Sequence, residues 1–172
     1  MNLFISTIRT ASRICGVFAA FLIAASVAVV CQMVVLRYFL NQSTVWQTDF
    51  VTYALVGATF IGAPYVAQIK GHVNVDLLPM YASHRWRMVL AYLAVFAALA
   101  FSGILAWTGW ELWYEAFDGS WLSDSVWELP LAIPYIAMPI GLTLMALEYL
   151  ADTLCLVRGD EVPFGTEPGG HP

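Results

Sequence analysis

Arg37 and Asp49 are the first candidates for chemistry in this sequence, because each lies about one turn inside a long apolar run. Arg37 is near the end of the first run and Asp49 is near the start of the second, so the two side chains are expected at similar depth. A guanidinium and a carboxylate placed in this way predict an ion pair that braces the two segments or contacts another subunit. The alternatives are two separately solvated charges and, less favoured, a substrate site.

A second pair, His72 and Asp76, lies four positions apart in the polar turn GHVNVD at residues 71–76. An imidazole and a carboxylate can begin a metal site, but a metal needs more ligands and only two other histidines are present. We therefore expect no metal here. The pair is interpreted as hydrogen-bonding to backbone or partner groups.

No set of residues typical of an enzyme accompanies these pairs. The sequence holds no Ser/His pair at a catalytic spacing, no convergent cluster of His, Cys and carboxylates, and no glycine-rich phosphate loop. Cys15, Cys31 and Cys155 are an odd number and lie in or at the ends of apolar segments, so we expect small apolar thiols and no disulfide framework. The sequence thus predicts no catalytic residues and no cofactor.

The composition predicts an integral membrane protein. Of the 172 residues, 60% are hydrophobic and 11% are charged, and the mean hydropathy is +0.74. Soluble domains carry roughly 25% charged residues. The net charge of -5, without a basic stripe, argues against nucleic acid as a partner and leaves the lipid bilayer as the expected surroundings.

Four apolar segments are long enough to cross the ~30 Å hydrocarbon core and predict an all-α protein with four transmembrane helices. We expect a membrane domain over residues 1–157 and a disordered tail over residues 158–172, which is rich in glycine and proline. Pro134 and Pro139 fall in the first half of the last helix, so an irregular start or a kink is expected there. The expected helices cover residues 14–40, 46–68, 86–114 and 130–157.

The basic residues predict that both termini are cytoplasmic. Six of the seven Lys and Arg residues flank the predicted helices on one side, and only Arg37 lies on the other. Cytoplasmic flanks carry the excess of basic residues in membrane proteins. The turn with His72 and Asp76 is therefore expected in the cytoplasm, and the acidic, tryptophan-containing segment 115–128 outside. The six residues are Arg9, Arg13, Lys70, Arg85, Arg87 and Arg158.

Small residues recur at every fourth position along each predicted helix. Such stripes let helix backbones approach closely, which is how helices associate in lipid. They predict packing within the chain or against a partner, although alanine-rich helices also show this spacing by chance. The stripes are Gly16, Ala20, Ala24 and Ala28; Ala54, Ala58 and Gly62; Ala94, Ala98, Ser102 and Ala106; and Ala137 and Gly141.

The central parts of the predicted helices hold no acidic, basic or histidine residue, although a transport path usually needs such groups at mid-membrane. Gln32, Thr59 and Thr108 are the polar exceptions, and we expect the two threonines to hydrogen-bond to their own helices. Glu148 and Asp152 lie one turn apart near the cytoplasmic end of the last helix. We expect them to be solvated or paired with the arginines within residues 85–87.

Seven tryptophans lie near the predicted helix ends. An aromatic belt at the two membrane interfaces is the favoured interpretation. The alternative is a surface that docks a soluble protein on the outside, because tryptophan is enriched at binding hot spots. The candidates for such docking are Trp46, Trp121, Asp124 and Trp127.

Short motifs follow one another in a fixed order over roughly residues 10–155. They are Arg37-Tyr38, Trp46-x-x-Asp49, Gly62-Ala63, GHVNVD at 71–76, Leu129-Pro130, Ile133-Pro134-Tyr135 and Pro139-Ile140-Gly141. This ordered set resembles the small, DctQ-like membrane subunit of tripartite ATP-independent periplasmic (TRAP) transporters. Asp49 departs from the family, in which glutamate is more common, but the shorter side chain still allows pairing with Arg37.

The resemblance implies a scaffold role in a three-part secondary transporter of the bacterial inner membrane. A periplasmic binding protein would capture a small organic acid, and a large membrane subunit would carry the substrate and sodium sites. The small subunit would brace the large subunit and help dock the binding protein. The alternative is a self-sufficient small transporter or channel that acts as a homo-oligomer.

Overall fold

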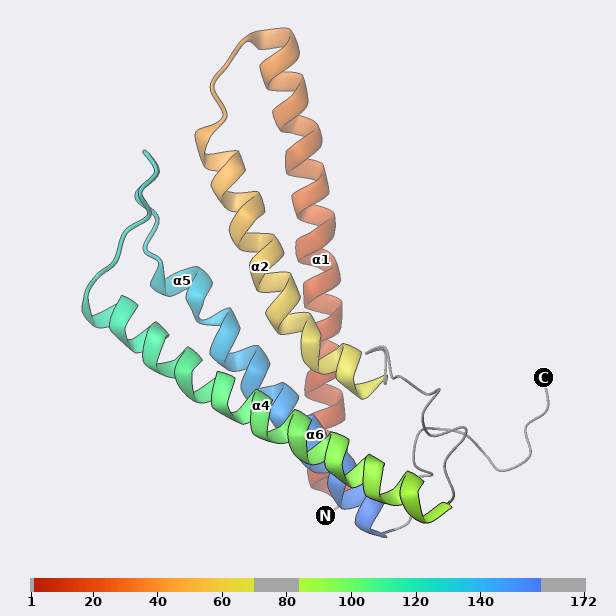
Figure 1. The fold of residues 1–172 in the computed structure, drawn as a ribbon. Helices are drawn as coiled ribbons and strands as arrows, with labels where there is room; N and C mark the ends of the chain where they lie inside the picture. The colour runs from red at the N-terminus through yellow and green to blue at the C-terminus, as the bar shows by residue number, and fades with distance from the viewer. Residues whose placement is uncertain (1, 70–83, 159–172) are drawn as a thin grey trace, which may run out of the picture.

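The chain folds into helices, and the described residues contain no strand. A computed structural model describes residues 2–69 and 84–158 (Figure 1). Four segments of it are long and apolar enough to cross a membrane, which confirms the predicted all-α membrane fold. The helices are α1 (Asn2–Leu40), α2 (Val45–Gln68), α4 (His84–Asp118), α5 (Ala132–Tyr135) and α6 (Ala137–Arg158).

The helices extend beyond the predicted ranges at several ends. α1 begins at Asn2 and not at residue 14, because the N-terminal segment contains no proline or glycine that would end the helix. α4 runs on to Asp118 and not only to residue 114. The turn with His72 and Asp76 lies outside the described residues, as does the tail after residue 158.

The last spanning segment has the irregular start that its prolines predict. α5 ends at Tyr135, and α6 begins at Ala137, so Ile136 separates the two helices. Pro139 then falls in the first turn of α6, where a missing backbone N–H breaks no helical hydrogen bond.

The spanning segments form two hairpins, α1 with α2 and α4 with α6, which meet near the N-terminus and separate toward the other end (Figure 1). α2 and α6 pack on each other, so they are the inner helices, and α1 and α4 are the outer ones. In the most apolar window, 28% of the residues of α2 and of the last segment are buried, against 11% for α1 and 17% for α4. The outer helices therefore leave most of their apolar surface uncovered by this chain.

The inner helices come closest at Gly141 of α6. A Cβ atom at this position would overlap the backbone carbonyl of Phe60 on α2. Ala137, one turn earlier on α6, is buried, and so are Ala54 and Ala58 of α2. The predicted stripes of these two helices therefore pack within the chain.

The other two small-residue stripes pack only in part. Ser102 and Ala106 of α4 are buried, and Gly16 of α1 lies against the ring of Tyr65 on α2. The rest of the α1 stripe is exposed, so nothing in the described part of the chain covers it. These exposed members are Ala20, Ala24 and Ala28.

Replacing Gly141 by alanine should destabilise the chain. Alanine usually stabilises a helix by about 1 kcal/mol relative to glycine. Here the new Cβ would meet backbone atoms that cannot move aside, and overpacking costs about 1–3 kcal/mol. Gly103→Ala is the matched control, because a Cβ at Gly103 meets nothing within 4 Å. Thermal melting of the purified full-length chain in mild detergent should show a lower Tm for Gly141→Ala only. Equal melting of the two variants would contradict the close contact.

Candidate interaction sites

Arg37 binds the connection between α1 and α2. Its Nε donates a hydrogen bond of 2.6 Å to Oγ1 of Thr44, the buried residue that precedes α2. In the same connection, Asn41 has a φ of 48°, a left-handed conformation that asparagine tolerates better than most residues. Arg37 therefore helps to hold the α1–α2 hairpin closed at its connection.

The described contacts of Arg37 and Asp49 do not include an ion pair between the two residues. Arg37 reaches Thr44 instead, which lies nearer along the chain. One oxygen of Asp49, Oδ2, is buried and accepts no hydrogen bond within the described residues, and the same holds for Oε1 of Gln47. The function of Arg37 and Asp49 at a subunit interface is not decided by this arrangement and stays a prediction.

The connection between α4 and α5 folds into a small outer hairpin, residues 121–131. The backbone N–H of Ser123 donates to the carbonyl of Leu129, and that of Leu131 donates to the carbonyl of Trp121, both at 2.9 Å. These bonds fix the two arms of the hairpin. Val126 lies at the tip and is 89% exposed.

The outer hairpin contacts the first turns of α2. The hydroxyl groups of Tyr53 and Ser123 are 3.1 Å apart, and the rings of Trp46 and Trp127 meet edge to face with centroids 6.5 Å apart. The outer hairpin therefore links the α1–α2 hairpin to the α4–α6 hairpin at the end of the molecule far from the N-terminus. Four predicted residues are exposed on this surface: Trp46, Trp121, Asp124 and Trp127. Their three indole rings remain about 40% exposed, at 43%, 41% and 40%.

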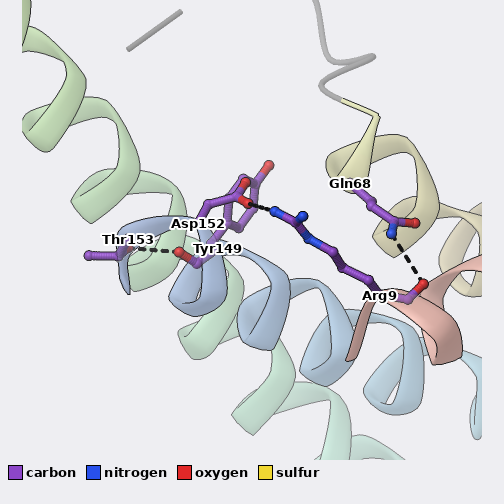
Figure 2. Close-up of polar contacts among 5 residues, drawn as sticks. All are labelled: Arg9, Gln68, Tyr149, Asp152 and Thr153. Carbon is purple, nitrogen blue, oxygen red and sulfur yellow. Dashed lines mark hydrogen bonds and ion pairs between the residues drawn. The ribbon is translucent and has the colours of Figure 1, made fainter. Parts of the chain in front are cut away.

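A polar cluster joins α1, α2 and α6 at the opposite end of the molecule (Figure 2). Arg9 Nη2 on α1 lies 3.9 Å from Asp152 Oδ1 on α6. Gln68 Nε2 on α2 donates a hydrogen bond of 3.1 Å to the backbone carbonyl of Arg9. Three helices that are distant in sequence are therefore tied together through one arginine residue.

Glu148 belongs to this cluster, and the expectation that it is solvated is wrong. The alternative, a pair with an arginine of residues 85–87, falls on side chains outside those described. Its side chain is 0% exposed, and Arg9 and Ser12 of α1 face its carboxyl group. The prediction failed because it began the first helix at residue 14, so the turns that carry Arg9 and Ser12 were not available to cover Glu148. A signal was present in the sequence, since α1 and α6 run antiparallel and each carries two polar residues about one turn apart.

Two threonines predicted at mid-membrane hydrogen-bond to their own helices. Thr59 Oγ1 donates to the carbonyl of Leu55 at 2.8 Å, and Thr108 Oγ1 donates to that of Ile104 at 3.2 Å, which confirms the prediction for both residues. Within residues 2–69 and 84–158, no group of three or more His, Cys, Asp or Glu side chains has a metal-binding arrangement.

Comparison with known proteins places this architecture in a family. The family of tripartite ATP-independent periplasmic transporters, DctQ component, matches residues 26–159. The chain is 27% identical over 161 residues to the C4-dicarboxylate TRAP transporter small permease protein DctQ of Vibrio cholerae. This alignment covers 81% of this chain and 69% of that protein. It is 28% identical over 119 residues to the protein of the same name from Rhodobacter capsulatus, over 69% of this chain and 52% of that relative. No solved structure gives a significant match. The chain belongs to the DctQ family of TRAP transporter components and is an integral protein of the inner membrane.

Proposed function

We propose that this chain is the small scaffold subunit of a TRAP-type secondary transporter that imports a small organic acid together with sodium. The relatives in Vibrio cholerae and Rhodobacter capsulatus are named for C4-dicarboxylates, so a C4-dicarboxylate is the first substrate to test. In this proposal both termini are cytoplasmic and the outer hairpin is periplasmic, as the basic residues favour. The observation that carries the scaffold role is the uncovered apolar surface of α1 and α4.

The large membrane subunit is proposed to pack on the exposed small-residue stripe of α1. A helix that meets only lipid gains nothing from a row of alanines, whereas a partner helix approaches closely over small side chains. Ala20, Ala24 and Ala28 form such a row and are exposed. On α4, Gly103 is a second small residue that faces open space.

The substrate and sodium sites are assigned to the large subunit. Transport sites at mid-membrane are usually built from ionisable groups or unwound helices. The described helices are continuous there, and the hydroxyls of Thr59 and Thr108 are occupied by their own helices. This distribution favours a scaffold role for the chain. It does not favour a transport path through the chain or an enzymatic activity.

The outer hairpin is proposed to contribute to the docking of the periplasmic binding protein. Interface hot spots combine exposed aromatic residues with a polar rim. Here three partly exposed indole rings surround a tip with an 89% exposed valine, and the acids Asp118, Asp124 and Glu128 are exposed around them. A binding protein with a basic docking face would fit this surface best.

Purification of the tagged chain from its native membrane in mild detergent tests the proposed function. Recovery of a large polytopic membrane protein in equal amount, identified by mass spectrometry, would support the scaffold role. Recovery of a homo-oligomer of this chain alone would instead favour the self-sufficient transporter, which would then be tested by transport assays on the chain in liposomes.

Ala24→Trp should weaken the complex with the large subunit without destabilising the chain. The indole would hold the partner helix away from α1, and the loss of close packing should lower the recovered partner at least about tenfold, or about 1.4 kcal/mol. Co-purification measures the partner, and melting of the chain alone should stay unchanged. Ile23→Trp, about 100° around α1 and already a large exposed side chain, is the control. Full recovery of the partner with Ala24→Trp would place the interface elsewhere.

Val126→Ser should weaken docking of the binding protein about tenfold, because it removes the most exposed apolar side chain at the tip of the outer hairpin. Titration of the reconstituted membrane complex with the purified binding protein gives the affinity. Gln42→Ser is the matched control, since Gln42 is exposed in the α1–α2 connection at the same end. An unchanged affinity for Val126→Ser would exclude the tip as a docking point.

A further inference from the structure

Glu148 is the one acid of the described chain that is completely buried inside a spanning segment. Its side chain is 0% exposed, and neither carboxyl oxygen has a hydrogen-bond partner among the described residues. It lies within the segment Ala132–Leu154, ~9 Å from the end of that segment at 1.5 Å per residue. An ionised carboxylate in such a place is costly unless a cation or several hydrogen bonds compensate it.

The basic residue that faces Glu148 is already engaged by another acid. Arg9 lies 3.9 Å from Asp152, and the two side chains are 38% and 19% exposed at the edge of the cluster (Figure 2). α2 contributes the neutral amide of Gln68 to the cluster. Within the described side chains, an ionised Glu148 would therefore have to share Arg9 with Asp152.

Ser12 is turned toward Glu148 and away from its own helix. Hydroxyls in the spanning helices generally donate to the carbonyl four residues earlier, as Ser26 and Thr59 do at 2.8 Å. Ser12 is also 0% exposed, but its Oγ makes no such bond and faces the carboxyl group of Glu148. A serine hydroxyl can donate to either form of a carboxyl group, but only the neutral acid can also donate to the hydroxyl oxygen, which then leaves neither group without a donor.

We propose that Glu148 binds a proton in the folded protein and, as a neutral acid, pairs with Ser12 across the contact between α1 and α6. The two helices then meet through two polar contacts in antiparallel order, Arg9 with Asp152 and Ser12 with Glu148. The charged pair lies at the exposed edge and the neutral pair lies deeper in the membrane. This proton-binding site concerns the chain alone and does not depend on the identity of its transport partners.

Infrared spectroscopy of the full-length chain in lipid nanodiscs at neutral pH tests the bound proton directly. The carbonyl stretch of a protonated carboxylic acid should be present in the wild-type chain, absent in Glu148→Gln, and shifted in frequency in Ser12→Ala. Glu128→Gln is the matched control and should keep the band, because Glu128 is an exposed acid of the outer hairpin at the other end of the molecule. Asp152→Asn should weaken the band, because it frees Arg9 to compensate an ionised Glu148. The absence of any carboxylic acid band that depends on Glu148 would overturn the proposal.

Thermal melting gives a second and independent test. Glu148→Gln keeps the shape, the donor and the acceptor of a neutral acid, so its Tm should stay close to that of the wild type. Glu148→Ala should melt clearly lower, because it leaves a cavity and an unpaired Ser12. If Glu148→Gln melts as low as Glu148→Ala, the charge of Glu148 is what the fold uses, and the neutral acid is excluded.

Discussion

The close contact between α2 and α6 at Gly141 is the constraint on which the rest of the structure depends. Lipid is as apolar as the helix surfaces, so helices in a membrane gain little from hiding apolar side chains and must gain from close packing. Only glycine lets α6 approach the backbone of Phe60 this closely. The contact joins two helical hairpins that otherwise share the outer hairpin and the polar cluster at the other end.

The packing of α2 on α6 explains why the chain is open. Because α2 and α6 pack on each other, α1 and α4 lie on the outside and meet a helical neighbour mainly on one side (Figure 1). A closed bundle would bury the small residues of all its helices. Here the stripe of α1 is left exposed beyond Gly16, and this exposed row is the surface on which the proposed contact with a larger subunit rests.

The sequence predicted what depends on local patterns and missed what depends on distant partners. Four apolar segments were enough to predict four spanning helices. The small-residue stripes predicted close packing, but not which of them pack within the chain. The solvation of Glu148 was predicted wrongly, because Arg9 and Ser12 face it from near the other end of the chain. The preference of Arg37 for Thr44 over Asp49 also depends on the geometry of a short connection, which spacing alone does not determine.

The described polar contacts of the spanning segments bind the helices to themselves and to one another. Threonine hydroxyls on α2 and α4 donate to carbonyl groups of their own helices. In the middle of the last segment, the indole N–H of Trp110 on α4 donates across to Oγ1 of Thr143 on α6 at 3.2 Å. At one end Arg9 meets Asp152, and at the other the outer hairpin meets α2. Contacts between helices at both ends and in the middle oppose relative movement of the helices, which supports the scaffold role proposed above.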